Sequence, residues 1–233
     1  MPPYAYYSGY GGYILWMLPI ILLSALASWA VNANYAKYSK VASRRGFTAA
    51  QVAELILRAN GIHDVSVTHV SGTMTDRYHP QQKYIGLSDG VYSSTSIAAL
   101  GIAAHEAGHA VQYSVGYGPI RLRGSLLPVA NFASKFSWIL IFVGFLLSDM
   151  VALAGILLFG VTVLFQLVTL PVEFNASRRA VAVLENGYLD SDEMVGAKKV
   201  LRAAAMTYVV ALLTSLWQMM RYILILFGNR SRR

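Results

Sequence analysis

Between residues 151 and 170 the chain reads VALAGILLFGVTVLFQLVTL, a run of 20 residues without a charged side chain. A helix needs roughly 20 predominantly apolar residues to cross the hydrocarbon core of a bilayer. Among the apolar segments of this chain, this one is the least interrupted. It therefore predicts that the protein is embedded in a membrane.

The overall composition agrees with a membrane protein. Hydrophobic residues make up 56% of the 233 residues and charged residues only 13%, whereas soluble domains have about 25% charged residues. The formal net charge is +8, but the basic residues lie mainly beside apolar stretches. We therefore take the charge as a signal of membrane topology and expect no nucleic-acid partner. The chain has no cysteine, which excludes disulfides, thiolate zinc ligands and cysteine nucleophiles.

Three other apolar segments complete the set of predicted spans. Residues 13–31 form a first transmembrane helix, taken as a retained anchor because the basic region of a cleaved signal peptide does not precede it. Residues 128–171 form a hairpin of helices 2 and 3, with a tight turn at Ser148-Asp149-Met150. The last segment, 203–227, contains Arg221, whose charge is costly in lipid unless it snorkels or faces protein. We expect about four transmembrane helices that anchor the protein in a lipid bilayer.

The basic residues between the spans indicate which side of the membrane they face. Short cytoplasmic segments are enriched in Lys and Arg, and the segments flanking the hairpin are basic, whereas its turn has only Asp149. We therefore expect a multi-pass protein of the plasma membrane whose polar segments are cytoplasmic. The tail residues Arg230, Arg232 and Arg233 are an exception, since four spans place them outside. The residues behind this expectation are Lys37, Lys40, Arg44, Arg45, Arg121, Arg123, Arg178, Arg179, Lys198, Lys199 and Arg202.

Residues 36–125 form the only polar block large enough to fold outside the membrane, and their pattern predicts a small α+β domain. A helix begins after Thr48, which forms a capping box with Gln51, and ends at Gly61. Residues 65–70 alternate like a half-buried strand.

A second short strand and a second helix follow in the same block. The strand is predicted at Lys83–Ser88, where Tyr84–Ser88 is either an ordinary sheet strand or an edge strand that pairs with an extended peptide. Ser94 or Thr95 then caps a helix over residues 97–112.

This second helix contains the sequence His105-Glu106-Ala107-Gly108-His109. Four residues along an α-helix place two side chains on one face, about 6 Å apart along the axis, so both imidazoles can bind one Zn²⁺. Glu106 lies beside the first ligand and can act as general base toward the water that the metal activates. The bare motif also occurs in polar stripes of surface helices. Here the apolar residues 97–104 favour a metal site, because buried polar groups need partners.

A catalytic zinc needs a third protein ligand, and without cysteine this ligand must be Asp, Glu or His. Glu173 is the foremost candidate because it follows the third span, at the start of a connector over residues 172–202. From the residues alone, Glu173 could equally be a helix cap or a partner of Arg178 or Arg179.

A family resemblance rests on four stretches of the chain, namely residues 92–100, 103–112, 171–177 and 203–209. Through them the sequence resembles the YugP-type membrane zinc metallopeptidases, bacterial neutral zinc peptidases related to the M48-like gluzincins. The resemblance covers nearly the whole chain. It implies a zincin-like domain in which His105, His109 and Glu173 bind one catalytic zinc and Glu106 is the base. The wider gluzincins have an aspartate four residues after the ligand glutamate, where this chain has Ser177, so another group must orient the histidines.

Four residues are weaker candidates for stabilising the oxyanion or orienting the ligands. Tyr208 could stabilise the oxyanion, although aromatic residues are common near the ends of membrane helices. Asn175 and Ser177 closely follow the candidate third ligand. His79 precedes the motif helix, although a loop histidine before a proline is more often solvated.

The sequence thus predicts a membrane-bound zinc endopeptidase. Because Glu173 stands just past the third span, we expect the site near the cytoplasmic membrane surface, which favours membrane proteins or their juxtamembrane segments as substrates. One alternative is a site-2-type intramembrane protease, which would place the motif inside a span and use an aspartate such as Asp149. The other is a non-catalytic membrane scaffold that binds metal, for which Glu106 would be dispensable. The oligomeric state does not follow from the sequence.

Overall fold

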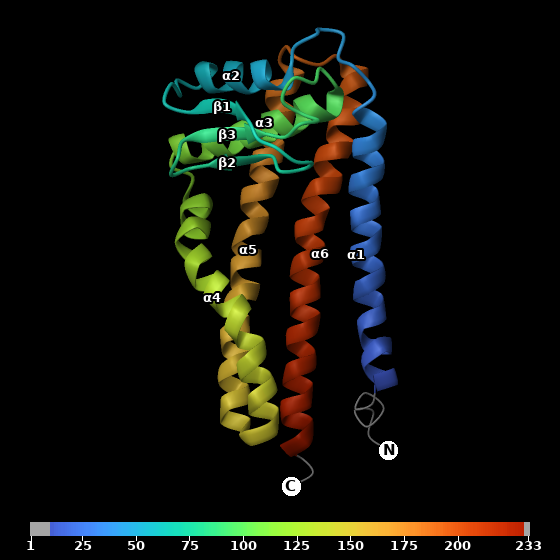
Figure 1. Ribbon diagram of the computed structural model, residues 1–233, viewed down its shortest axis with the longest axis vertical. Coiled ribbons are helices and arrows are strands. Elements are labelled where there is room, and N and C mark those ends of the chain that lie inside the picture. The colour runs from blue at the N-terminus through green and yellow to red at the C-terminus, as the bar shows by residue number, and fades with distance from the viewer. Residues whose placement is uncertain (1–9, 231–233) are drawn as a thin grey trace. The chain divides into compact units, whose positions relative to one another are not determined.

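The computed structural model describes residues 10–230 (Figure 1). These residues form two compact units. The first unit comprises the described residues up to 27, residues 122–170 and the described residues from 207 onward. The second unit comprises residues 28–121 and 171–206. Residues 1–9 and 231–233 lie outside the described residues. The second range includes Arg232 and Arg233, which were part of the topology prediction. The elements are α1 (Tyr10–Tyr38), α2 (Ala49–Ala59), β1 (Ser66–His69), β2 (Arg77–His79), β3 (Tyr84–Leu87), α3 (Ile97–Ser114), α4 (Gly118–Leu147), α5 (Asp149–Glu185) and α6 (Ser191–Arg230).

Four of these helices, α1, α4, α5 and α6, are long and apolar enough to cross a membrane. The prediction of a mainly helical protein with about four candidate membrane spans and a small sheet is therefore confirmed. Each helix is longer than its apolar segment. The helix α6, for example, begins at Ser191, well before the segment predicted at residues 203–227.

The hairpin of α4 and α5 in the first unit has a tighter turn than the sequence suggests. Only Ser148 separates the two helices, and its N–H donates to the carbonyl of Gly144 at 2.9 Å. A Cβ atom at Gly144 would lie 2.1 Å from the backbone nitrogen of Ala152. Glycine at this position therefore allows the two helix ends to meet.

The sheet of the second unit has the strand order β1-β3-β2, with β3 parallel to β1 and antiparallel to β2. Figure 1 shows the three strands side by side, with α2 next to β1. The prediction that Tyr84–Ser88 could be an edge strand is wrong, because β3 is bonded on both sides. The sequence did not predict β2, whose three residues are too few to show an alternating pattern.

Two helices of the second unit, α2 and α3, begin at hydroxyl caps. The capping box of Thr48 and Gln51 at the start of α2 is present as predicted. For α3 the cap is Ser96, whose hydroxyl accepts from the N–H of Ala99 at 3.2 Å, so the prediction of Ser94 or Thr95 is wrong. Most residues of α3 from Ile97 to Gln112 are buried, which places this helix in the core of the unit.

The helix α5 passes without a break through Pro171, from the apolar residues 151–170 to Glu185. Proline has no N–H and so leaves one carbonyl of the preceding turn without its helical donor. Residues 171–185 of α5 belong to the second unit. As a result the connector predicted at residues 172–202 consists of the last turns of α5, a short loop and the first turns of α6.

Candidate metal centre

The two motif histidines lie one turn apart on the buried helix α3 of the second unit. Their rings meet edge to face, with centroids 4.7 Å apart. The helix forms at this place because alanines, which favour helix, surround the motif and Ser96 satisfies an N–H group of the first turn. His105 is half-buried and His109 is buried, so both imidazoles need polar partners within the protein.

Glu173 reaches the same point from the second-unit part of α5. Only 2% of its surface is exposed, and its Oε2 lies 3.2 Å from Nε2 of His105 and 3.6 Å from Nε2 of His109. A ligand atom from each of the three residues lies within 4.8 Å of the others. Because Glu173 lies inside a helix, it does not act as a helix cap, which was one of the alternatives from the sequence.

These separations suit a zinc ion. Zinc binds nitrogen and oxygen at about 2.0–2.2 Å in tetrahedral geometry, so two of its ligand atoms lie roughly 3.3–3.5 Å apart. The distances from Glu173 Oε2 to the two Nε2 atoms bracket this value. Two imidazoles with one carboxylate are also a known donor set for catalytic zinc, which leaves a fourth position open. The residues present therefore fit the metal that the family resemblance implies.

The electrostatic environment of His109 reflects the two glutamates nearby. Burial lowers the pKa of its imidazole, but the interaction with Glu173 and the charge of Glu106 outweigh burial, so the pKa is raised above its ordinary value. The region around the two rings therefore attracts positive charge, as a cation site does.

The outer nitrogens of the two histidines contact groups other than a carboxylate. Nδ1 of His105 lies 3.2 Å from the hydroxyl of Ser177, which occupies the position where the wider gluzincins have aspartate. Nδ1 of His109 lies 2.9 Å from Oε1 of Gln112. Gln112 was not predicted as part of the site. Its signal is its spacing, because a residue three positions after His109 lies on the same helix face.

Glu106 contacts the sheet. Its Oε2 accepts a hydrogen bond of 2.8 Å from the N–H of Tyr78, which lies on β2, one of the two edge strands of the sheet. The contact therefore fixes the predicted general base relative to the edge of the sheet.

Close approach of α3 and α5 depends on a glycine between the two histidines. A Cβ atom at Gly108 would lie 3.0 Å from the carbonyl oxygen of Ala176 and 3.4 Å from its Cα. Only a residue without a side chain leaves this contact unstrained. Gly108 thus allows Glu173, one turn earlier in α5, to reach the histidines.

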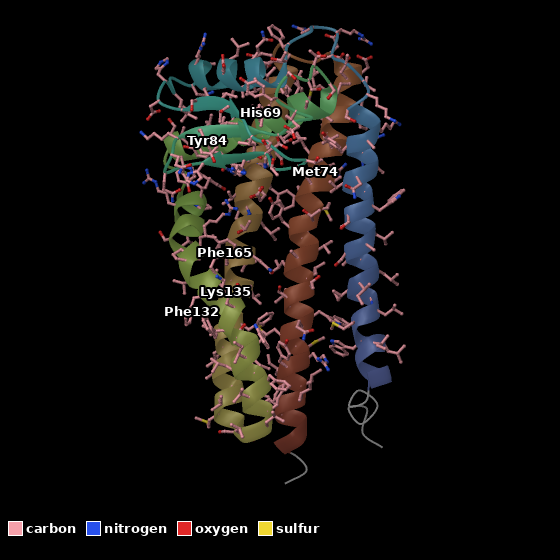
Figure 2. All side chains as sticks on the ribbon, viewed as in Figure 1. His69, Met74, Tyr84, Phe132, Lys135 and Phe165 are labelled. Carbon is pink, nitrogen blue, oxygen red and sulfur yellow. The ribbon has the colours of Figure 1, made fainter. Side chains whose placement is uncertain are left out.

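The remaining candidates have different surroundings. Asn175 Oδ1 accepts from Nε2 of Gln112 at 3.0 Å and from Nε of Arg179 at 2.9 Å. The ring of His79 stacks on Tyr84, which Figure 2 labels on the sheet, and its Nδ1 accepts from the N–H of Gln82. Tyr208 lies on α6 in the residues of the first unit. Roles for His79 and Tyr208 in catalysis stay predictions.

Comparison with known proteins agrees with this chemistry. Residues 13–227 match a family described as "Putative neutral zinc metallopeptidase". The chain is 45% identical over 210 residues to "Putative membrane protease YugP" of Bacillus subtilis (strain 168), an alignment that covers 89% of this chain and 93% of the relative. No solved structure matches the chain. The resemblance noted from the sequence is confirmed, and the chain belongs to this neutral zinc metallopeptidase family.

Proposed function

We propose that this protein is a membrane-bound zinc endopeptidase whose single catalytic zinc is held by His105, His109 and Glu173. The observation that supports this proposal most directly is the convergence of the three side chains, with the buried Oε2 of Glu173 facing Nε2 of both histidines. A buried carboxylate that meets two imidazoles is typical of a metal site, because each of the three groups supplies one ligand atom.

The chain's own residues supply the base and its orientation. When bound, zinc lowers the pKa of a water molecule toward neutrality and polarises the carbonyl of the scissile peptide. Glu106 accepts the proton of the attacking water and then delivers it to the nitrogen of the leaving amine. The N–H of Tyr78 orients Glu106 through its bond to Oε2. Ser177 and Gln112 contact the ligands on the side away from Glu173.

The proposed site lies on the cytoplasmic side of the plasma membrane in a multi-pass protein. Support comes from the basic residues that flank the hairpin 128–171, set against the single acidic residue Asp149 in its turn. Tagging each loop and measuring its accessibility in sealed cells tests this topology. External labelling of the loop at residues 70–76 would contradict it.

Proteins of the membrane are the proposed substrates. Glu173 follows the apolar residues 151–170 after only two residues in the sequence, which supports substrates that present juxtamembrane segments. The purified full-length enzyme is expected to cleave a membrane-tethered substrate in lipid vesicles faster than the same segment in soluble, unfolded form. Equal rates on both would refute the preference for membrane proteins.

The enzymatic proposal is tested with Glu106→Gln. This variant is expected to bind zinc as the wild type does but to lose proteolysis by a factor of about 10²–10⁴, the typical contribution of a general base. Unchanged cleavage would remove Glu106 from the mechanism. Because the variant should bind substrate without cutting it, it also serves to capture the natural substrate from native membranes.

Metal content separates this proposal from a site-2-type protease. Glu173→Gln is expected to lose zinc, whereas Asp149→Asn is expected to retain it. The reverse result would favour an aspartate ligand. A non-catalytic scaffold would instead show zinc binding with no cleavage by the wild-type protein.

A further inference from the structure

Gln112 is a fully buried polar side chain on α3, with 0% of its surface exposed. Its amide makes three close contacts. Oε1 lies 2.9 Å from Nδ1 of His109, and Nε2 lies 2.8 Å from the carbonyl oxygen of Val172 and 3.0 Å from Oδ1 of Asn175. A buried amide with these contacts is well satisfied, which sets Gln112 apart from an incidental core residue.

The contact with Val172 determines which way the amide faces. A backbone carbonyl can only accept a hydrogen bond, so the amide atom beside Val172 O must be the NH₂ group. The other amide atom is then the oxygen, which can only accept. It follows that Nδ1 of His109 carries a proton and donates it to Gln112.

This proton position fixes the tautomer of His109. A neutral imidazole protonated at Nδ1 has its free lone pair on Nε2. Nε2 is the atom that faces Oε2 of Glu173, 3.6 Å away. Gln112 thus presents the lone pair of His109 toward the position where the ligand atoms converge.

The same amide also holds the third ligand. Val172 directly precedes Glu173 in the chain, so the bond from Gln112 to Val172 O ties α3 to the turn of α5 that bears the glutamate. Asn175 in turn accepts from Nε of Arg179, which anchors the second acceptor of the amide. One side chain therefore connects a histidine ligand with the backbone of the glutamate ligand.

We propose that Gln112 is a positioning residue of the metal centre, which sets the tautomer of His109 and the separation of the two ligand-bearing helices. It supplies by a neutral amide the orienting contact that carboxylates supply in many zinc sites. The inference rests on the proposed zinc site.

The test compares two substitutions of similar length in the full-length protein in detergent. Met at position 112 fills the space without an acceptor, whereas Glu retains an oxygen that accepts from Nδ1 of His109 and, in its protonated form, a donor for Val172. The affinity for zinc is measured by competition with a chromophoric chelator. Gln112→Met is expected to bind zinc about 10–100-fold more weakly, the range for loss of such a partner, and Gln112→Glu to lose less than about tenfold, below that range.

Ser96→Ala is the matched control. It removes a buried polar contact at the other end of the same helix, so it lowers the melting temperature of the metal-free protein without changing zinc affinity. If Gln112→Met binds zinc as tightly as the wild type, or if Gln112→Glu is weakened as much as Gln112→Met, the inference is overturned.

Two further measurements keep the inference testable if the Met variant does not fold. The first is an NMR measurement on zinc-loaded wild-type protein labelled with ¹⁵N-histidine. The histidine signal that is missing in His109→Ala belongs to His109. This signal is expected to show a proton on Nδ1, and a proton on Nε2 would overturn the inference. His109→Ala in the chelator assay tests the site itself. Wild-type affinity in that variant would refute the proposed zinc site, whereas loss there together with wild-type affinity in Gln112→Met would refute only the role of Gln112.

Discussion

Two apolar helical segments of this protein are built for different surroundings. The helix α3 is rich in alanine and glycine, and most of its side chains are buried in the second unit. Residues 151–170 of α5 are rich in leucine, valine and phenylalanine, and three of their leucines, Leu157, Leu164 and Leu167, are exposed in the first unit, with Leu157 at 68%. Small residues allow close packing against protein, whereas large exposed ones suit lipid. Hydrophobicity alone does not distinguish the two cases.

The contrast is tested most strongly by truncating one leucine in each segment. Leu100 is fully buried in α3, so Leu100→Ala is expected to lower the free energy of unfolding by about 2–5 kcal/mol through lost burial and a new cavity. Leu157→Ala removes an exposed side chain and should cost less than about 1 kcal/mol in the same detergent. Denaturant unfolding monitored for each variant measures both values. Equal losses would show that residues 151–170 are packed against protein as α3 is.

Of the two segments, only α3 is expected to be stabilised when zinc binds. A ligand at 100 times its dissociation constant stabilises the state that binds it by about 2.7 kcal/mol. Hydrogen exchange should therefore slow in α3 when zinc replaces a chelator, while residues 151–170 stay unchanged. In Glu173→Gln, which lacks one of the proposed ligands, the slowing should disappear. Equal slowing in that variant would mean that zinc binds elsewhere.

Two glycines sharpen the comparison further. A Cβ atom at Gly108 would lie 3.0 Å from the carbonyl oxygen of Ala176, whereas a Cβ atom at Gly160 in α5 would have nothing within 4 Å. Gly108→Ala should cost about 1–3 kcal/mol, as overpacking does, and weaken zinc binding. Gly160→Ala should be neutral or stabilise by up to about 1 kcal/mol, because alanine favours helix. Thermal unfolding of the two variants measures both changes in stability. Destabilisation of the same size in both would contradict the difference in packing.

The smallest expected effect concerns charge at the start of α6 in the second unit. The hydrogen bond from Arg44 lowers the pKa of the exposed Asp192 carboxyl below its ordinary value. A lowered pKa in the folded state adds stability above the unfolded pKa of about 3.9, and this stability is lost as the pH falls through the folded value. Arg44→Gln should flatten the dependence of melting temperature on pH below about pH 4. High salt should have a similar effect on the wild type because the pair is exposed.

Sequence patterns predicted the elements that repeat a simple rule along the chain. The four candidate spans followed from long apolar runs, and the histidine pair from the spacing of one helical turn. The cap of α3 was misplaced because Ser94, Thr95 and Ser96 all have hydroxyls, and only the backbone geometry selects Ser96.

Contacts between distant parts of the chain were harder to predict. Glu173 is far from the motif in sequence, and the residues around it could not show whether it is a metal ligand or a helix cap. The strand β2 was missed because three residues show no periodicity, so its contact with Glu106 could not be foreseen. Gln112 lay within the quoted motif region, but its burial and its contact with Val172 depend on how α5 packs.

The hydrogen bond from Tyr78 to Glu106 has a consequence for conformational entropy. The two oxygens of a free carboxylate are interchangeable, and the group rotates among equivalent orientations. In this protein Oε2 is committed to the N–H of the sheet edge, so the equivalence is broken before any substrate arrives. In the proposed reaction, in which Glu106 is the base, this loss of rotational freedom accompanies folding and would not have to be repeated at each turnover.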